Sequence, residues 1–183
     1  MALAPRIPRR LTALCLGGAA TLEADKHSAL SLFDPDIIIA CNHAGRDEAG
    51  RVDHWVTMHP ELFPAWTAAR AAAGRPAPGR LWRPRHRKCA LDAGVLESWG
   101  GSSGLLCVQV GLELECTHIV LAGIPMHQNA CHYDDKRKWR EARQYWPGWE
   151  RHRPDMIDRV RSVSGWTLQL LGPPTKEWLD GDG

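Results

Sequence analysis

The sequence Asp36-Ile-Ile-Ile-Ala-Cys41, followed at once by Asn42-His43-Ala44-Gly45, points to the class of fold. The first part is short, continuous and rich in β-branched residues, which is typical of a strand buried on both faces of a sheet. The polar and small residues that follow indicate a sharp turn. We therefore predict a strand over 36–41 in the interior of a parallel sheet.

Segments of the same kind lie on both sides of this strand and alternate with helical ones. Strands are predicted over 11–16, 52–58, 118–122 and 160–164, and helices over 23–33, 61–73, 105–114 and 134–145, with a short closing helix near 178. This alternation predicts a parallel sheet with helices on both faces. The expected fold is α/β: an open Rossmann-like, mostly parallel sheet in a single domain over 1–183, with its core at about 11–133.

Two segments fall outside this core pattern. Residues 75–88 hold six Arg and Lys residues, three prolines and Trp82 without one acid, so they are predicted to be an excursion from the core. Residues 134–183 form an aromatic-rich tail. The chain has nine Trp against two Phe and two Tyr, and Trp is enriched at interfaces. We expect the excursion and the tail to contact an assembly partner or a second copy of the chain.

The composition bounds the partners and the compartment. The chain has 183 residues, with 23 Lys and Arg against 21 Asp and Glu and a formal charge of +2. Bulk charge therefore gives no argument for nucleic acid, and no apolar run approaches the roughly 18 residues of a membrane helix. Six cysteines without a C-x-x-C spacing indicate reduced thiols and a cytoplasmic location. His127, Cys131 and His132 have a spacing that could supply metal ligands, of which zinc usually takes three or four, but no metal site is predicted.

Candidate binding residues follow the predicted strands. Ligands of parallel α/β sheets bind beyond the carboxyl ends of the strands, and a helix start there suits a phosphate. Each candidate also has an ordinary structural explanation, such as a turn glycine, a serine N-cap or a histidine bonded to a carbonyl. Either histidine that follows a strand could be a general base. The candidates are Gly17, Gly18, Asn42, His43, His59, Ser102, Ser103 and Gly104.

The order of these pieces resembles a known group of proteins. Gly17-Gly18-Ala-Ala-Thr-Leu22, Cys41-Asn42, Ser102-Ser103-Gly104-Leu105 and Gly123-Ile124 stand where that group has its motifs. The group comprises the bacterial sialyltransferases of glycosyltransferase family 42, the archaeal hydroxymethylpterin diphosphokinase type and the motility-associated glycosyltransferase-like proteins. The resemblance covers roughly residues 11–133.

This resemblance implies a role for each matching residue. Gly17 and Gly18 would let the backbone approach a phosphate, Asn42 and His43 would contact the nucleotide, and Ser102, Ser103 and Gly104 would hold its phosphate or base edge. His59 precedes Pro60 where the sialyltransferases have a nucleotide-contacting Asn, and His132-Tyr133 resembles a His-Tyr pair near their base. His132 or His59 would be the catalytic base and Tyr133 would contact the nucleotide. A nucleotide sugar is the implied donor, and Mg²⁺ is not expected to be required.

The sequence also departs from the pattern of this group. Ala19-Ala20 replace a Pro-Ser pair, and Pro125 stands where an acid follows Gly-Ile. Three functions therefore remain as expectations. The first is a nucleotide-binding, glycosyltransferase-like protein that transfers a glycosyl group from a nucleotide sugar. The second is a non-catalytic structural or assembly protein, for example a phage virion or morphogenesis protein. The third is a diphosphokinase-like enzyme.

Overall fold

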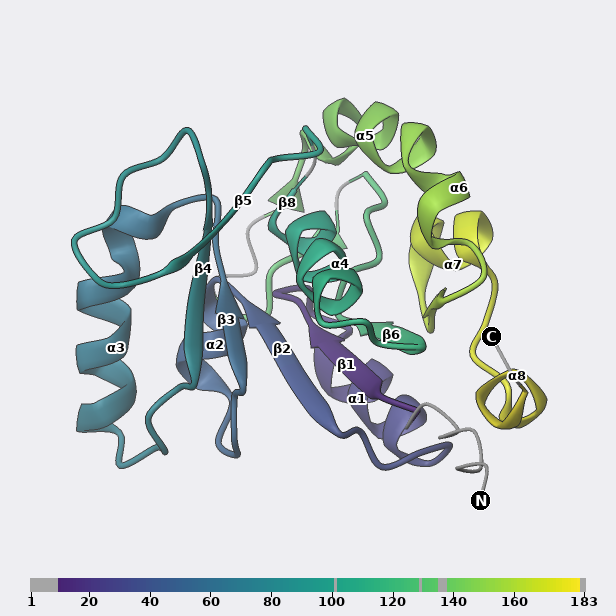
Figure 1. Cartoon of the computed structure of the whole chain (residues 1–183), viewed down its shortest axis with the longest axis horizontal. Coiled ribbons are helices and arrows are strands. Elements are labelled where there is room, and N and C mark those ends of the chain that lie inside the picture. Colours follow the sequence, from purple (N-terminus) through teal and green to yellow (C-terminus); the bar gives the residue numbers. More distant parts are fainter. Residues whose placement is uncertain (1–9, 101, 129, 135–137, 182–183) are drawn as a thin grey trace, which may run out of the picture.

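The central sheet collects segments that lie far apart in the sequence (Figure 1). In the computed structural model, which describes residues 10–100, 102–128, 130–134 and 138–181, this sheet has seven strands. Every pair of neighbours is parallel, which confirms the predicted α/β class. In spatial order the strands are β5 (Gly94–Leu96), β4 (Arg80–Pro84), β3 (His54–Val56), β2 (Ile37–Cys41), β1 (Thr12–Leu16), β6 (His118–Ala122) and β9 (Val160–Ser162).

The strand order reverses at β1. Successive strands β2 to β5 extend the sheet in one direction, whereas β6 pairs with the other edge of β1. Leu14 accordingly aligns with Ile38 on one side and with Val120 on the other. In open α/β sheets the crevice at such a reversal is where ligands bind. This reversal therefore directs attention to the loops after β1, β2 and β6.

The remaining elements cover both faces or close the end of the chain. Residues 130–131 and 138–139 pair as a small antiparallel ribbon, β7 (Ala130–Cys131) and β8 (Lys138–Trp139). The helices are α1 (Leu22–Leu30), α2 (His43–Asp47), η1 (Pro60–Leu62), α3 (Phe63–Ala72), α4 (Ser103–Glu113), η2 (Ala142–Tyr145), α5 (Trp146–Arg151), α6 (Arg153–Met156), α7 (Gly165–Leu171) and α8 (Lys176–Asp180).

Alternate side chains of the central strands enter two separate cores. Cys15 and Ile39 pack with α4 on one face, and Leu14 packs with α1 and α3 on the other. Helix α4 lies across the near face of the sheet in Figure 1, with α1 behind it. All residues of α4 from Ser103 to Gly111 are buried. This burial explains the continuous apolar sequence and confirms the predicted buried helix.

The composition of residues 75–88 predicts an excursion from the core, but the structure keeps part of this segment in the sheet. They contain β4, which lies between β3 and β5. Leu81 and Trp82 are buried in the two opposite cores. The guanidinium of Arg80 lies 4.5 Å from the Trp82 ring, so the charged side chain covers the indole instead of marking a loop. Only residues 85–88 form an exposed charged run.

The predicted helix over 134–145 is also wrong. Residues 138–139 form β8 and residues 142–145 form η2, while 135–137 lie outside the described residues. The tail completes the core, because β9 joins the sheet and Trp149 and Met156 are fully buried. The core therefore extends well beyond residue 133. Trp82 and Trp149 are accordingly core residues and contribute little to any partner surface.

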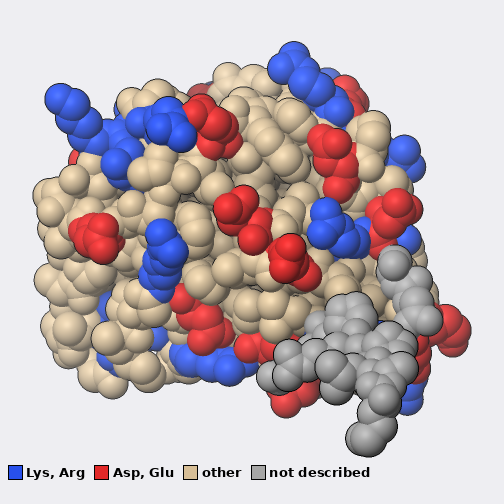
Figure 2. Space-filling model, in the orientation of Figure 1, with Lys and Arg blue, Asp and Glu red and all other residues tan. Residues whose placement is uncertain are grey.

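Charges of both signs are interspersed over the face shown in Figure 2, in keeping with the small net charge. Blue side chains gather mainly at the upper left, over the segment that follows β4 in Figure 1. Within the part of the chain that the structure describes, no helix is both long enough and apolar enough to cross a membrane.

Candidate functional site at the carboxyl edge of the sheet

The turn from β2 into α2 places Asn42 at the carboxyl edge of the sheet. Its backbone has φ 49° and ψ −126°, a combination that residues with a side chain rarely adopt. A sharp strand-to-helix elbow of this kind exposes its apex side chain above the sheet, as the nucleophile turn of α/β-hydrolases does. Here the apex carries an amide, which offers hydrogen bonds rather than a nucleophile.

Trp55, in β3, holds this elbow in place. Its indole is fully buried, and its Nε1 donates a 2.9 Å hydrogen bond to the main-chain oxygen of Asn42. Gly45, in α2, packs directly on the indole, and a Cβ there would lie 2.1 Å from Trp55 Nε1. The elbow therefore depends on a glycine at 45 and on a ring of this size at 55.

The side chains that directly follow β2 and β3 meet the first residue of α4 at Asn42. Asn42 Oδ1 accepts hydrogen bonds from Thr57 Oγ1 at 2.7 Å and from Ser103 Oγ at 3.1 Å. Ser103 Oγ in turn accepts from the main-chain nitrogen of Met58 at 3.2 Å. These contacts occupy Oδ1, and no hydrogen bond from Nδ2 is found within the described residues. The Nδ2 group is therefore the part of Asn42 that can donate to a ligand.

Helix α4 begins at the same place. Ser102 stands at its N-cap position but makes no side-chain bond to the first turn, so the N–H groups of that turn have no side-chain cap. A Cβ on Gly104 would lie 2.7 Å from Ile124 Cγ2, which explains the glycine as a close approach to the loop after β6. Ser102 and Ser103 are 9% and 6% exposed.

The loops after β1 and β6 pack directly against each other through their main chains. Gly17 N donates to Ala122 O at 2.8 Å, and a Cβ on Gly17 would lie 2.3 Å from Gly123 O. The segment at 130–133 then crosses Gly18, where Tyr133 N donates to the Gly18 oxygen at 3.2 Å. Gly17 thus serves the packing of neighbouring loops.

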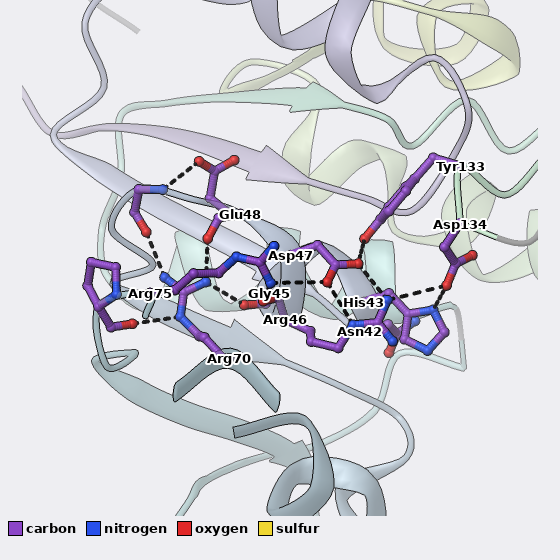
Figure 3. Close-up of polar contacts among 12 residues, drawn as sticks. Asn42, His43, Gly45, Arg46, Asp47, Glu48, Arg70, Arg75, Tyr133 and Asp134 are labelled. Atoms are coloured by element: carbon purple, nitrogen blue, oxygen red, sulfur yellow. Dashed lines mark hydrogen bonds and ion pairs between the residues drawn. The ribbon is translucent and has the colours of Figure 1, made fainter. Parts of the chain in front are cut away.

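A charged cluster extends from the elbow in another direction (Figure 3). His43 Nδ1 contacts Asp134 Oδ2, and Arg46 Nη2 lies 3.6 Å from the same oxygen. The imidazole also packs edge-on against Trp66, with 5.2 Å between the ring centroids, and 31% of the His43 side chain is exposed. A carboxylate at Nδ1 orients the ring and leaves Nε2 as the nitrogen that can exchange a proton.

Asp47 connects this cluster to the segment that crosses Gly18. Arg46 binds its carboxylate through two hydrogen bonds, of 2.7 and 2.6 Å, and Tyr133 Oη donates to it at 2.8 Å. The hydrogen bond from Arg46 holds the pKa of Asp47 below its usual value. Burial, aided by the bond to Asp47, raises the pKa of Tyr133, so the phenol stays protonated and donates. Tyr133 therefore anchors its segment to α2 and keeps no acidic proton for exchange.

Arg70, in α3, binds the main chain at the end of α2. It is 1% exposed, and its guanidinium donates to the main-chain oxygens of Gly45, Glu48, Gly50 and Pro76 at 2.5–2.9 Å. Burial lowers its pKa, yet arginine titrates so high that it keeps its charge. The cation thus satisfies the carbonyl groups at the end of α2 that the helix leaves open.

The other predicted histidines have different surroundings. The His59 imidazole is more than half exposed and lies 3.5 Å from Glu61, while its main-chain nitrogen donates to Thr57 Oγ1 at 2.9 Å. His132 lies beside Gly18, and its ring centroid is 6.5 Å from that of Trp139. Of the three predicted histidines, His43 is the one whose ring contacts a partly buried carboxylate.

Thr57 and Asp134 belong to the site but are not among the residues predicted from the sequence. Thr57 follows the third strand, β3, directly, whereas the strand predicted over 52–58 includes it. Asp134 could not have been found, because its partner His43 lies far away in the sequence. Within the described residues, no group of three or more His, Cys, Asp and Glu side chains could hold a metal ion.

The site thus combines an amide at a strained elbow, a hydroxyl at the start of a buried helix and an oriented imidazole. The structure establishes a parallel α/β sheet of Rossmann-like character. Neither the known family models nor the curated proteins include a match to this chain.

Proposed function

We propose that the carboxyl edge around Asn42 binds the phosphate end of a nucleotide, and that the protein is a glycosyltransferase-like enzyme using a nucleotide sugar. The observation that carries this proposal is the meeting of Asn42 and Ser103 at the start of α4, beside the reversal of the strand order. The Asn42 amide N–H and the N–H groups of the first turn of α4 are donors that suit phosphate oxygens. The Ser103 hydroxyl donates to Asn42 Oδ1 and so holds the amide in position.

The strained backbone at Asn42 costs the folded protein stability, and this cost is in keeping with a role in binding a ligand. A backbone conformation of this kind costs on the order of 1–3 kcal/mol and persists only when its surroundings impose it. Trp55 and Gly45 impose it here, and Thr57 and Ser103 fix the orientation of the amide. Asn42 Nδ2 is therefore oriented before a ligand arrives, which lowers the entropy lost on binding.

His43 is the group that we assign to proton transfer. It follows Asn42 directly, and Asp134 fixes it through Nδ1. His43 Nε2 would take the proton from an acceptor hydroxyl while that oxygen forms a bond to the anomeric carbon of the donor. The bond from this carbon to the phosphate oxygen breaks, and the nucleotide leaves with the electron pair. The donors at Asn42 and α4 would stabilise the negative charge on the leaving phosphate.

A thermal-shift and calorimetric screen with nucleoside mono- and diphosphates tests the binding step. We expect at least one nucleotide to raise the melting temperature. Ser103→Ala should weaken its affinity about tenfold, because it removes the bond that orients the Asn42 amide toward a charged ligand. Ser28→Ala, which removes an exposed hydroxyl in α1, is the matched control and should leave affinity unchanged. The proposal fails if millimolar nucleotides give no shift.

Activity assays and light scattering, added to the binding screen, separate the alternative functions. His43→Asn should retain nucleotide binding and abolish release of the nucleotide from its sugar conjugate, whereas His59→Asn should retain both. Consumption of a nucleoside triphosphate with transfer of pyrophosphate would instead identify a diphosphokinase. Complete absence of nucleotide binding, together with a defined oligomer in light scattering, would favour the assembly role.

A further inference from the structure

A second surface feature borders the same edge of the sheet. It is a depression of about 390 Å³ between the loop after β6, η2 with the start of α5, and α7. Among the described residues, no acidic side chain lines it. Its lining residues are His127, Gln128, Arg143, Trp146, Gly165, Trp166 and Gln169.

Two tryptophans form the floor of this depression. The rings of Trp146 and Trp166 are stacked, with 4.4 Å between centroids and 2° between planes. Trp146 Nε1 donates to the main-chain oxygen of Met126 at 2.8 Å, and the main-chain nitrogen of Trp166 donates to Pro125 O at 2.7 Å. The Trp146 indole and the Trp166 main chain are therefore both tied to the loop after β6, which makes the stack a fixed platform.

A flexible side chain lies over one face of Trp146. Because Trp166 occupies one face of the ring, the Arg143 guanidinium, 5.4 Å from the Trp146 centroid, lies over the other. Arg143 is exposed, so it can move aside without unfolding any element. We propose that a nucleobase binds here, stacked between Trp146 and Arg143.

The chemistry of the lining favours a heteroaromatic ring. Indole and guanidinium groups stack on the π-faces of bases, and amide side chains pair with base edges because they donate and accept at once. Gln128 and Gln169 are exposed at the rim and offer such amides. Because the described residues of the lining include no carboxylate, an anionic nucleotide meets no like charge from them.

The position of the depression connects it to the phosphate site, and in this respect the inference rests on the proposed function. Met126 lies between the two: its Sδ accepts from Ser102 Oγ at 3.5 Å, and its main-chain oxygen accepts from Trp146 Nε1. One buried residue thus separates the start of α4 from the platform. A nucleotide with its phosphate at α4 would cross Met126 and place its base on Trp146.

Calorimetry with matched ligands tests the platform separately from the phosphate site. The probes are the four common nucleoside 5′-monophosphates, ribose 5-phosphate as the ligand without a base, and the free nucleosides. We expect the preferred nucleotide to bind at least about tenfold more tightly than ribose 5-phosphate, the effect of one stacked base. Trp146→Ala and Arg143→Ala should reduce that ratio and leave ribose 5-phosphate binding unchanged, whereas Ser103→Ala should weaken both ligands.

Trp178→Ala, in α8, is the matched control and should keep the ratio. Arg143 is exposed, so its variant remains informative if Trp146→Ala does not fold. Equal affinity for nucleotide and ribose 5-phosphate, or an unchanged ratio in the Arg143 and Trp146 variants, would overturn the platform and leave the phosphate site standing. Binding of free nucleosides that depends on Trp146, without any binding of phosphates, would overturn the proposed function and retain the platform. No binding of any probe would overturn both.

Discussion

Ser103 and Asn42 are 61 positions apart in the chain, and Ser103 Oγ donates a 3.1 Å hydrogen bond to Asn42 Oδ1. This bond joins the start of α4 to the elbow after β2, across the carboxyl edge of the sheet. Because the elbow is strained and α4 is buried, the bond orients a polar group without requiring any rearrangement.

Asn42→Gly should be more stable than Asn42→Ala, by about 1 kcal/mol or more. Both variants lose the amide, but glycine accepts the conformation at φ 49° that costs alanine strain. Urea unfolding of the two variants measures the difference. Both should lose nucleotide affinity equally, since neither keeps Nδ2. If alanine is the more stable of the two, the elbow is not strained.

Gly45→Ala should destabilise the protein by about 2–4 kcal/mol, because its Cβ would overlap the Trp55 indole, which is buried and cannot retreat. Gly50→Ala is the matched control. Its nearest atom would be Glu48 Oε1 at 3.3 Å, the end of a flexible side chain, so it should cost less than about 1 kcal/mol. Chemical denaturation gives both values, and equal values would contradict the account of the elbow.

Arg70→Met should lower the free energy of unfolding by about 3 kcal/mol. The methionine fills part of the volume but leaves four main-chain oxygens without their donor. Arg151→Met, at an exposed position in α5, should change stability by no more than about 0.5 kcal/mol. Hydrogen exchange should also show faster opening of α2 in the Arg70 variant. A stable variant with protected α2 amides would exclude Arg70 as the support of that helix.

Stability should fall as the pH is lowered from 7 to 5. Burial lowers the pKa of both His54 and His118 in the folded state below the usual value of 6.5. The unfolded chain therefore binds protons first, so folding free energy is fully present above pH 6.5 and is lost as the pH falls toward the folded-state pKa values. At His54 protonation also breaks the 2.9 Å bond that Nδ1 accepts from Trp82 Nε1.

Urea midpoints measured across this range test the titration. The variants His54→Asn and His118→Gln cannot take up a proton, so each should flatten the pH dependence relative to the wild type. His27→Gln changes an exposed side chain of α1 and is the control. This variant should show the same dependence of the urea midpoint on pH as the wild type. A wild-type midpoint that rises toward pH 5 would contradict the sign argued here.

The central strands could be predicted from the sequence because burial on both faces leaves a continuous apolar run. Residues 37–41 and 118–122 show this pattern, and their ends agree with the prediction almost to the residue. Residues 80–84 could not be recognised, since Arg80 and Arg83 flank the two buried side chains. A short strand with charged neighbours gives no periodic signal.

The candidate site could be predicted in part for a similar reason. Asn42 and Ser103 each follow or begin a recognisable element, so their place at the carboxyl edge follows from the parallel sheet. The pairing of His43 with Asp134 depends on the path of the segment that crosses Gly18, which no local pattern encodes. Whether Gly17, Gly18, His59 and His132 act on a ligand stays a prediction.

The reversal of strand order at β1 also has a consequence for biosynthesis. Strands β2, β3, β4 and β5 can each add to the growing sheet as they leave the ribosome, because each joins the strand made just before it. One edge of β1 must wait until residues 118–122 emerge, and until then its row of main-chain N–H and C=O groups is open. The nascent chain up to residue 117 is therefore the species most exposed to wrong pairing, and slow translation before residue 118 should increase its need for a chaperone.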